Sequence, residues 1–263
     1  MANIFKNGFF DRKLEKVKRS NVYWKYTDTL KKVMYAHNYT HFWVDRADEL
    51  TNLMRTKAPD VDNDWYRYQH KEFTLTFSFS DAAIKQYQPI IREFSSFSAA
   101  VRILGSYENY FEAIIRATMK TFPEKVKAFS HKYKLKKVNI KNVKNLMSTK
   151  LCRGIIFVEQ LFDYDANPPY KPLINFFFGM RNVAVHNSNI ATEKLCKFAE
   201  SEFINFDRHL NEGDKVEWSF YHALQLNQFV LQILDEIDTV VCPPLRLKTA
   251  TDYRHWFLSG KKS

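Results

Sequence analysis

Apolar residues spaced three and four positions apart are the feature that most constrains the fold of this chain. From Ser98 the spacing runs without a break and predicts a helix that ends before Pro123. Its periodic positions are Ala100, Ile103, Leu104, Tyr107, Phe111, Ile114, Ile115 and Thr118. Similar patterns predict helices over residues 145–162, 192–203 and 218–241. A further helix is predicted to begin near residue 172. Only six of 263 residues are glycine, below the usual share of about 7%, which also favours helices.

Residues 91–242 are therefore expected to form a helical bundle, and the fold class is mainly α. The first 90 residues form either a separate module or an N-terminal helical elaboration, with helices predicted over 11–36 and 39–57. An alternating pattern of apolar residues predicts at most a short strand or hairpin near residues 72–80, and segment 215–220 is the candidate partner strand. Residues 243–263 are expected to be a basic tail.

The charge of the chain points to an anionic partner. Forty Lys and Arg against 29 Asp and Glu give a formal net charge of +11, which favours nucleic acid first and an anionic membrane surface second. The alternative is a lysine-rich surface that only keeps the protein soluble. The chain shows neither a signal-peptide pattern nor an apolar run long enough to span a membrane, and its three cysteines are widely spaced. We therefore expect a cytoplasmic protein without disulfides, zinc or other cofactors.

Polar residues close the most apolar of the predicted helices. Arg181, Asn182 and His186 follow a run rich in phenylalanine, where polar groups are costly unless they are paired or face a cleft. Asn182 and His186 are four positions apart and share a helix face. Arg181 lies roughly 140° around an ideal helix from His186. The alternative is an ordinary helix C-terminus, where Arg and His complement the helix dipole.

The pattern Arg181-Asn182-x-x-x-His186, followed by Asn187, resembles the signature of HEPN-domain ribonucleases, which are all-α proteins of prokaryotic toxin–antitoxin and abortive-infection systems. Segment 104–111, which carries Glu108, is similar to a helix often found upstream in that family. The resemblance covers residues 91–242 and leaves the first 90 unexplained. It implies a homodimer whose two motifs face each other in a composite site, and it raises the prospect of an antitoxin or another defence-system partner.

These residues suit metal-independent cleavage of RNA. A histidine can remove the proton of the 2′-hydroxyl, and an arginine can stabilise the charged phosphorane. His186 and Arg181 are the candidates for these roles, with Asn182 positioning a group and Asn187 in support. The expected products are a 2′,3′-cyclic phosphate and a 5′-hydroxyl. Glu108 either orients His186, meets Arg181 or forms an ordinary structural ion pair.

Two other functions stay open at this point. One is a HEPN-like module that binds nucleotide or RNA without cutting it, and the other is a regulatory subunit whose basic surface docks an acidic antitoxin. A basic run between residues 131 and 150 contains no acidic residue and predicts either RNA phosphate contacts or a solvated loop. Its lysines are Lys132, Lys134, Lys136, Lys137, Lys141, Lys144 and Lys150.

Two patterns that imitate metal sites are set aside. His37, His41 and Asp45 have helical spacing but lie on an amphipathic segment rich in aromatic residues, so a metal is not expected there. The acidic residues of segment 60–64 imitate the start of a calcium loop, but Trp65 stands where such a loop requires glycine. We expect no metal.

Overall fold

The computed structural model is mainly helical, which confirms the predicted fold class. The structure describes residues 18–47, 49, 65–70, 73–78, 81–134, 154–201, 204 and 209–250. Of residues 65–70, 73–78 and 81–85 it describes the backbone only. None of the helices within these ranges combines the length and the hydropathy needed to cross a membrane.

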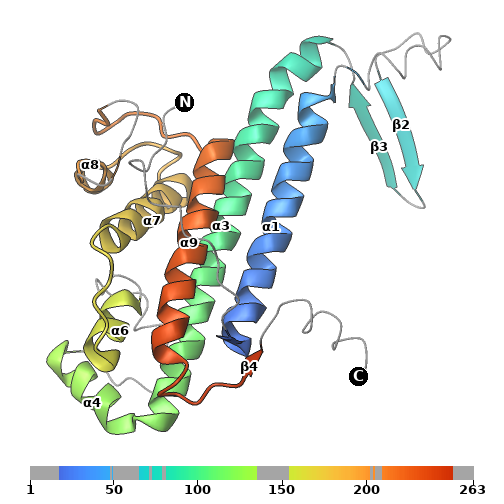
Figure 1. Ribbon diagram of the computed structural model, residues 1–263. Helices are drawn as coiled ribbons and strands as arrows, with labels where there is room; N and C mark the ends of the chain where they lie inside the picture. Colours follow the sequence, from blue (N-terminus) through green and yellow to red (C-terminus); the bar gives the residue numbers. More distant parts are fainter. Residues whose placement is uncertain are drawn as a thin grey trace.

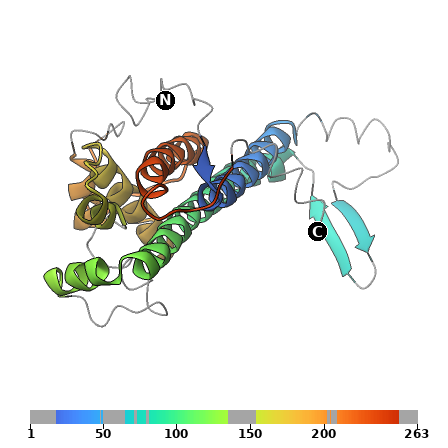
Figure 2. The same cartoon turned by 60° about the horizontal axis from the view of Figure 1, so that its bottom comes forward.

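Three long helices lie side by side and form the frame of the molecule (Figure 1). They are α1 (Asn21–Asp45), α3 (Asp81–Thr121) and α9 (Phe220–Val241). Their facing residues are almost fully buried, among them Leu30 of α1, Ile103 of α3 and Ile233 of α9. The outer ends of α1 and α3 extend past the end of α9 (Figure 2). One continuous core therefore joins the N-terminal helix to the bundle.

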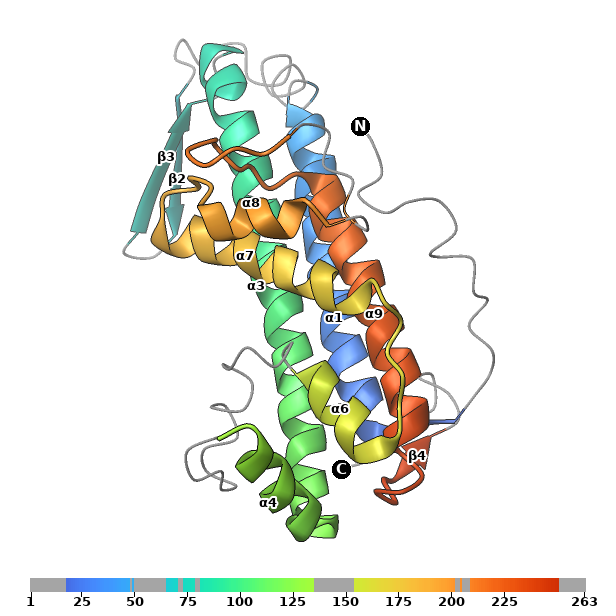
Figure 3. The same cartoon turned by 90° about the vertical axis from the view of Figure 1, so that its left-hand side faces the viewer.

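Shorter helices cover the frame on one side (Figure 3). They are α4 (Pro123–Lys132), α6 (Ile155–Phe162), α7 (Tyr170–His186) and α8 (Glu193–Ala199). The helix α7 crosses α3 at a steep angle (Figure 3). It buries Phe176, Phe177 and Phe178 completely or nearly so. Burial of a side chain of this size contributes roughly 1.5–3 kcal/mol, so α7 is held firmly where it crosses the frame.

Two glycines permit close packing, one between α7 and α8 and one between α6 and α3. At Gly179 a Cβ atom would lie only 2.9 Å from the Leu195 Cδ1 atom, so the missing side chain lets α8 approach α7. Gly154 has a φ of 100° and leads into α6, and a Cβ atom there would lie 2.1 Å from the Phe111 Cδ1 atom. Only glycine satisfies both the backbone angle and the contact at that position.

A buried polar cluster ties the start of α1 to the end of α9. The strand β1 (Arg19–Ser20) pairs with β4 (Thr249–Ala250), and Ser20 caps α1. The Ser20 backbone N–H donates to Asp238 Oδ2 at 2.7 Å, and the Tyr110 hydroxyl donates to Asp238 Oδ1 at 3.2 Å. Arg19 donates twice to Asp235, at 2.7 and 2.9 Å. Burial raises the pKa of Asp238, while the hydrogen bonds from Ser20 and Tyr110 oppose that shift.

The helices of the N-terminal part differ from the predicted ones. Residues 36–39 do not break a helix, because α1 runs unbroken through them. His37 and His41, near the predicted break, are only 2% and 8% exposed. The helix α3 begins at Asp81, and not near Ser98, and contains Pro89. The domain boundary placed between residues 90 and 91 therefore falls inside a helix whose partner, α1, shares the core of the bundle.

The strand predicted near residues 72–80 is present, but its partner was predicted wrongly. The strand β3 (Phe73–Ser78) pairs antiparallel with β2 (Trp65–His70), with His70 opposite Phe73. The end of β2 and the start of β3 are only three positions apart in the sequence. So short a connection favours a hairpin between neighbouring strands over pairing with a distant segment. Segment 215–220 instead contributes one bridge, from Lys215 to Ile190.

Candidate functional site

The predicted site residues lie on the last turns of α7, where the helix passes from the core to the surface (Figure 3). Met180 and Val183 still face the core and are 0% and 4% exposed. Arg181 and Asn182 are half-buried, and His186 is exposed. The end of an apolar helix thus carries a cation, an amide and an imidazole on its accessible sides.

Three groups hold the Arg181 side chain in place. Its Nη1 atom lies 3.6 Å from Glu108 Oε2 on α3, and its Nη2 atom donates to Asn182 Oδ1 at 3.2 Å. Its guanidinium carbon lies 5.1 Å from the centre of the Phe178 ring. The Arg181 side chain is 26% exposed, so the guanidinium is oriented and still open to an anion. Of the roles considered for Glu108, the structure places its carboxylate beside Arg181.

His186 is the last residue of α7 and points into solvent rather than toward a described polar partner. Among the described residues we find no hydrogen bond to its ring. No contact joins it to Arg181 within these ranges either, in keeping with the wide angle that separates the two positions around the helix. One protomer therefore brings together Arg181, Asn182 and Glu108 and leaves His186 at the adjacent edge.

The turn after His186 fixes the end of the helix. The Asn187 and Asn189 backbone N–H groups both donate to the Val183 carbonyl, at 2.9 and 3.1 Å. The Asn187 side chain donates to the Ile190 carbonyl at 2.7 Å. Ser188 and Asn189 have φ angles of 49° and 64°, a left-handed geometry that asparagine tolerates well. Asn187 thus acts here as a turn residue that ends α7.

The same turn is joined to α3 and to the segment before α9. Asn189 Nδ2 donates to Glu93 Oε1 at 3.4 Å. The Ala191 N–H donates to the Asp214 carbonyl, and the Val216 N–H donates to the Asn189 carbonyl, both at 2.8 Å. These bonds hold the segment after His186 on two neighbouring elements.

The predicted RNA-binding lysines are placed only in part. Lys132 ends α4 and donates to Gln160 Oε1 at 2.6 Å, and Lys134 follows in the turn. In Figures 1 and 3, α4 lies near the opposite end of the bundle from the hairpin and well away from the end of α7. The other lysines of the run lie outside the described residues, namely Lys136, Lys137, Lys141, Lys144 and Lys150.

The two histidines of α1 have a packing role. The His37 and His41 ring centres are 4.5 Å apart, and the Phe220 ring stacks on His37 at 5.0 Å. His37 Nδ1 lies 3.1 Å from Ser95 Oγ, and His41 Nε2 lies 3.3 Å from Ser96 Oγ. Burial and the neighbouring His41 lower the pKa of His37 to about 4, against a weaker opposing effect of the Phe220 backbone. Within the described ranges, no three side chains are arranged to hold a metal ion.

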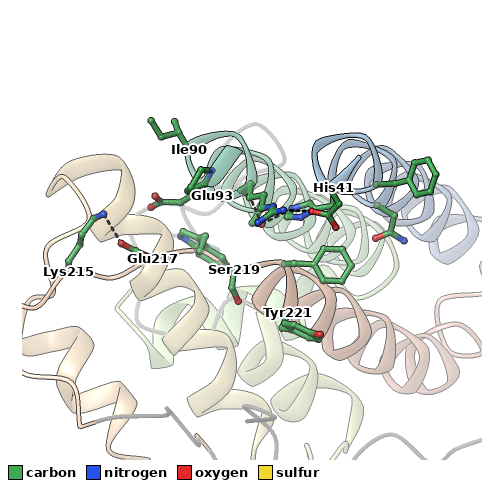
Figure 4. A pocket seen from close by; sticks show the side chains of 15 residues that line it. His41, Ile90, Glu93, Lys215, Glu217, Ser219 and Tyr221 are labelled. Atoms are coloured by element: carbon green, nitrogen blue, oxygen red, sulfur yellow. Dashed lines mark hydrogen bonds and ion pairs between the residues drawn. The ribbon is translucent and has the colours of Figure 1, made fainter. Parts of the chain in front are cut away.

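A groove that the sequence did not reveal lies beside the turn after α7 (Figure 4). It has a volume of about 880 Å³ and is formed by α1, α3 and segment 215–221. Its walls come from three separate parts of the chain, so no local pattern could have predicted it. The one hint in the sequence is that α1 carries aromatic residues, such as Phe42, on the side of the helix that faces away from the core.

No protein-family model, no curated protein and no solved structure matches this chain.

Proposed function

We propose that this protein is a metal-independent endoribonuclease that cuts RNA through attack of the 2′-hydroxyl on the adjacent phosphate. The observation that carries the proposal is the guanidinium of Arg181, which Glu108 and Asn182 orient while about a quarter of the side chain stays exposed. An oriented cation that remains open to solvent suits an anion better than it suits a structural ion pair.

The chemistry needs one base, one acid and one fixed cation. His186 takes the proton of the 2′-hydroxyl, whose oxygen then bonds to phosphorus while the bond to the 5′-oxygen breaks. Arg181 stabilises the extra negative charge on the phosphorane, and its planar fork matches two phosphate oxygens. A protonated histidine supplies the leaving 5′-oxygen with its proton, because imidazole changes charge near physiological pH. The products are a 2′,3′-cyclic phosphate and a 5′-hydroxyl.

A homodimer supplies the second set of groups. Arg181 and His186 are on different sides of α7, so one protomer does not assemble them around one phosphate. Two copies that meet at the ends of their α7 helices bring two arginines and two histidines to a shared axis. The arrangement implied by the resemblance to HEPN ribonucleases therefore supplies what a single protomer lacks. The exposed Val185, which is 54% accessible, offers apolar area for such a contact.

The cellular setting follows from the same resemblance and belongs to the proposal. A cytoplasmic toxin or abortive-infection nuclease would act on cellular or phage RNA and would be held inactive by an antitoxin or another defence partner. The net charge of +11 suits either RNA or an acidic antitoxin.

Cleavage of structured RNA in the presence of EDTA tests the proposal. We expect 2′,3′-cyclic phosphate ends from the wild type, and a loss of about 10²–10⁴-fold in rate for His186→Ala. The matched control is His209→Ala, since His209 is also exposed and lies outside both the α7 motif and the basic run 131–150. Full activity of the His186 variant with an unchanged melting curve would remove the catalytic role.

The second candidate is a module that binds nucleotide or RNA without cutting it. The observation in its favour is the lack of any contact between His186 and Arg181 within the described residues of one protomer. In that case Arg181→Ala weakens RNA binding, while the wild type produces no cyclic phosphate ends under any ionic condition.

A further inference from the structure

We propose that the groove between α1, α3 and segment 215–221 binds an unpaired RNA base, with a preference for guanine, next to the cleavage site. The inference rests on the proposed function, because it assigns a base-reading subsite to the same nuclease. Its volume of about 880 Å³ lies within the range of roughly 300–1,000 Å³ typical of small-molecule and cofactor sites.

Exposed aromatic rings line the groove. Phe42 on α1 and Tyr221 at the start of α9 both line the groove and are 49% and 48% exposed. Figure 4 shows Tyr221 at the edge of the groove across from α3. Proteins bind single-stranded nucleic acid by stacking bases on such half-exposed rings.

Charged groups of both signs complete the walls. Arg92 pairs with Asp45 on α1, with 2.5 Å between Nη2 and Oδ1, and Lys215 pairs with Glu217 at 2.6 Å on the facing segment (Figure 4). The side chains of both cations are about half exposed, at 43% for Arg92 and 59% for Lys215. Both cations are therefore accessible to the phosphates of a bound strand as well as to the carboxylates with which they pair.

Glu93 is the group that favours guanine. Glu93 lines the groove together with the two cations, and its described hydrogen bond, from Asn189 Nδ2, is long at 3.4 Å. A carboxylate accepts two parallel hydrogen bonds. Guanine is the base that offers two neighbouring N–H donors, N1 and N2, on one edge. Cytosine and adenine offer a single amino group there, so they should bind less well.

A buried donor in the wall has no acceptor among the described residues. Trp218 lines the groove and is only 2% exposed, and its Nε1 atom has no hydrogen-bond partner within those ranges. Buried N–H groups nearly always have a partner. The O6 atom of guanine is an acceptor on the same edge as its N1 and N2 donors, so guanine carries the kind of group that Trp218 Nε1 lacks within the described residues.

The groove is joined directly to the catalytic end of α7. Asn189, three residues after His186, donates to Glu93 in the wall, and its carbonyl accepts from Val216. A base held in the groove would therefore keep its strand beside His186. Recognition at this distance would choose which phosphate meets the catalytic groups.

Calorimetry with mononucleotides tests the subsite apart from any cleavage. Wild-type protein should bind GMP more tightly than IMP, which lacks the N2 amino group, and more tightly than AMP, CMP and UMP. Tyr221→Ala should weaken GMP binding by roughly 5- to 150-fold, the loss expected for one stacked base. Glu93→Gln should remove most of the difference between GMP and IMP. The matched controls are Tyr35→Ala, which removes an exposed aromatic ring of α1 that does not line the groove, and Glu124→Gln on α4.

Cleavage measured in parallel separates this inference from the proposed function. If GMP binds the groove and no RNA is cut, the subsite stands and the nuclease proposal fails. The opposite result is that RNA is cut and His186 is required, but the cut positions show no preference for guanine. If Tyr221→Ala and Glu93→Gln then also bind all nucleotides as the wild type does, the subsite is wrong. A change in oligomeric state in Tyr221→Ala and Phe42→Ala, without nucleotide binding by the wild type, would overturn it too and show a protein contact.

Discussion

Glu108 on α3 lies 3.6 Å from the guanidinium of Arg181 on α7, so the proposed catalytic cation takes its orientation from a neighbouring helix. Both side chains are partly exposed, at 32% and 26%. Ion pairs with this exposure contribute about 0–1 kcal/mol to stability. The contact therefore explains the direction of the guanidinium better than it explains the stability of the fold.

Glu108→Gln should lower the cleavage rate by about tenfold or more and leave the free energy of unfolding nearly unchanged. The substitution removes the charge that holds Arg181 and keeps the size of the side chain, and small misplacements of catalytic groups are costly. Single-turnover cleavage and thermal unfolding measure the two effects. The control is Glu112→Gln, which breaks the 2.6 Å pair with Arg116 on the same helix. Equal rates in the two variants would show that Glu108 has no positioning role.

The sequence predicted those helix ends at which the spacing of apolar residues, or a proline, marks the boundary. The helix α9 was expected over 218–241 and spans Phe220–Val241, and α3 ends at Thr121, just before Pro123, as predicted. The continuity of α1 was missed because His37 and His41 are polar. Their burial depends on Phe220, a distant residue whose ring packs against both histidines.

The candidate site could be predicted only as far as it lies on one helix. Arg181, Asn182 and His186 were proposed because they close the most apolar helix in a pattern that resembles HEPN ribonucleases, and their places on α7 follow from the helix. The contact between Arg181 and Glu108 was one of several options, because it depends on where α7 crosses α3. The groove beside Glu93 was not foreseen, since it requires the packing of three segments that no local pattern connects.

A dimer with a composite site should make catalytic variants dominant-negative. When His186→Ala protein is mixed in excess with the wild type and allowed to exchange subunits, activity should fall below the value expected from dilution. The reason is that mixed dimers lack one of the two histidines. Light scattering measures the oligomeric state, and His209→Ala protein serves as the mixing control. A strictly monomeric wild type with full activity would end this idea.

The basic segment after α4 should contribute RNA affinity and not chemistry. Replacement of Lys134, Lys136 and Lys137 by Gln should raise the dissociation constant for RNA and reduce the slope of log K against log salt by about 2, the value for three phosphate contacts on single strands. The maximal cleavage rate should stay the same, since Lys134, the described member of the three, directly follows α4, which lies far from the end of α7 (Figure 3). A variant that binds normally but does not turn over would assign the segment to the active site.

The stability of the fold should fall in mildly acidic solution, and His37 should account for a measurable part of the change. Burial beside His41 lowers the pKa of His37 from 6.5 to about 4. Above pH 6.5 the ring is neutral in both the folded and the unfolded chain, so its contribution is fully present. Between pH 6.5 and about 4 only the unfolded chain takes up the proton, and the free energy of unfolding falls by up to about 3 kcal/mol.

The variant His37→Gln tests this contribution. It keeps a polar group near Ser95 but does not titrate, so its free energy of unfolding should fall less steeply over this pH range in urea titrations. His131→Gln also replaces an exposed histidine, in α4, and is the control for the loss of an imidazole ring. Parallel curves for the wild type and His37→Gln would show that His37 is protonated as readily in the fold as in the unfolded chain.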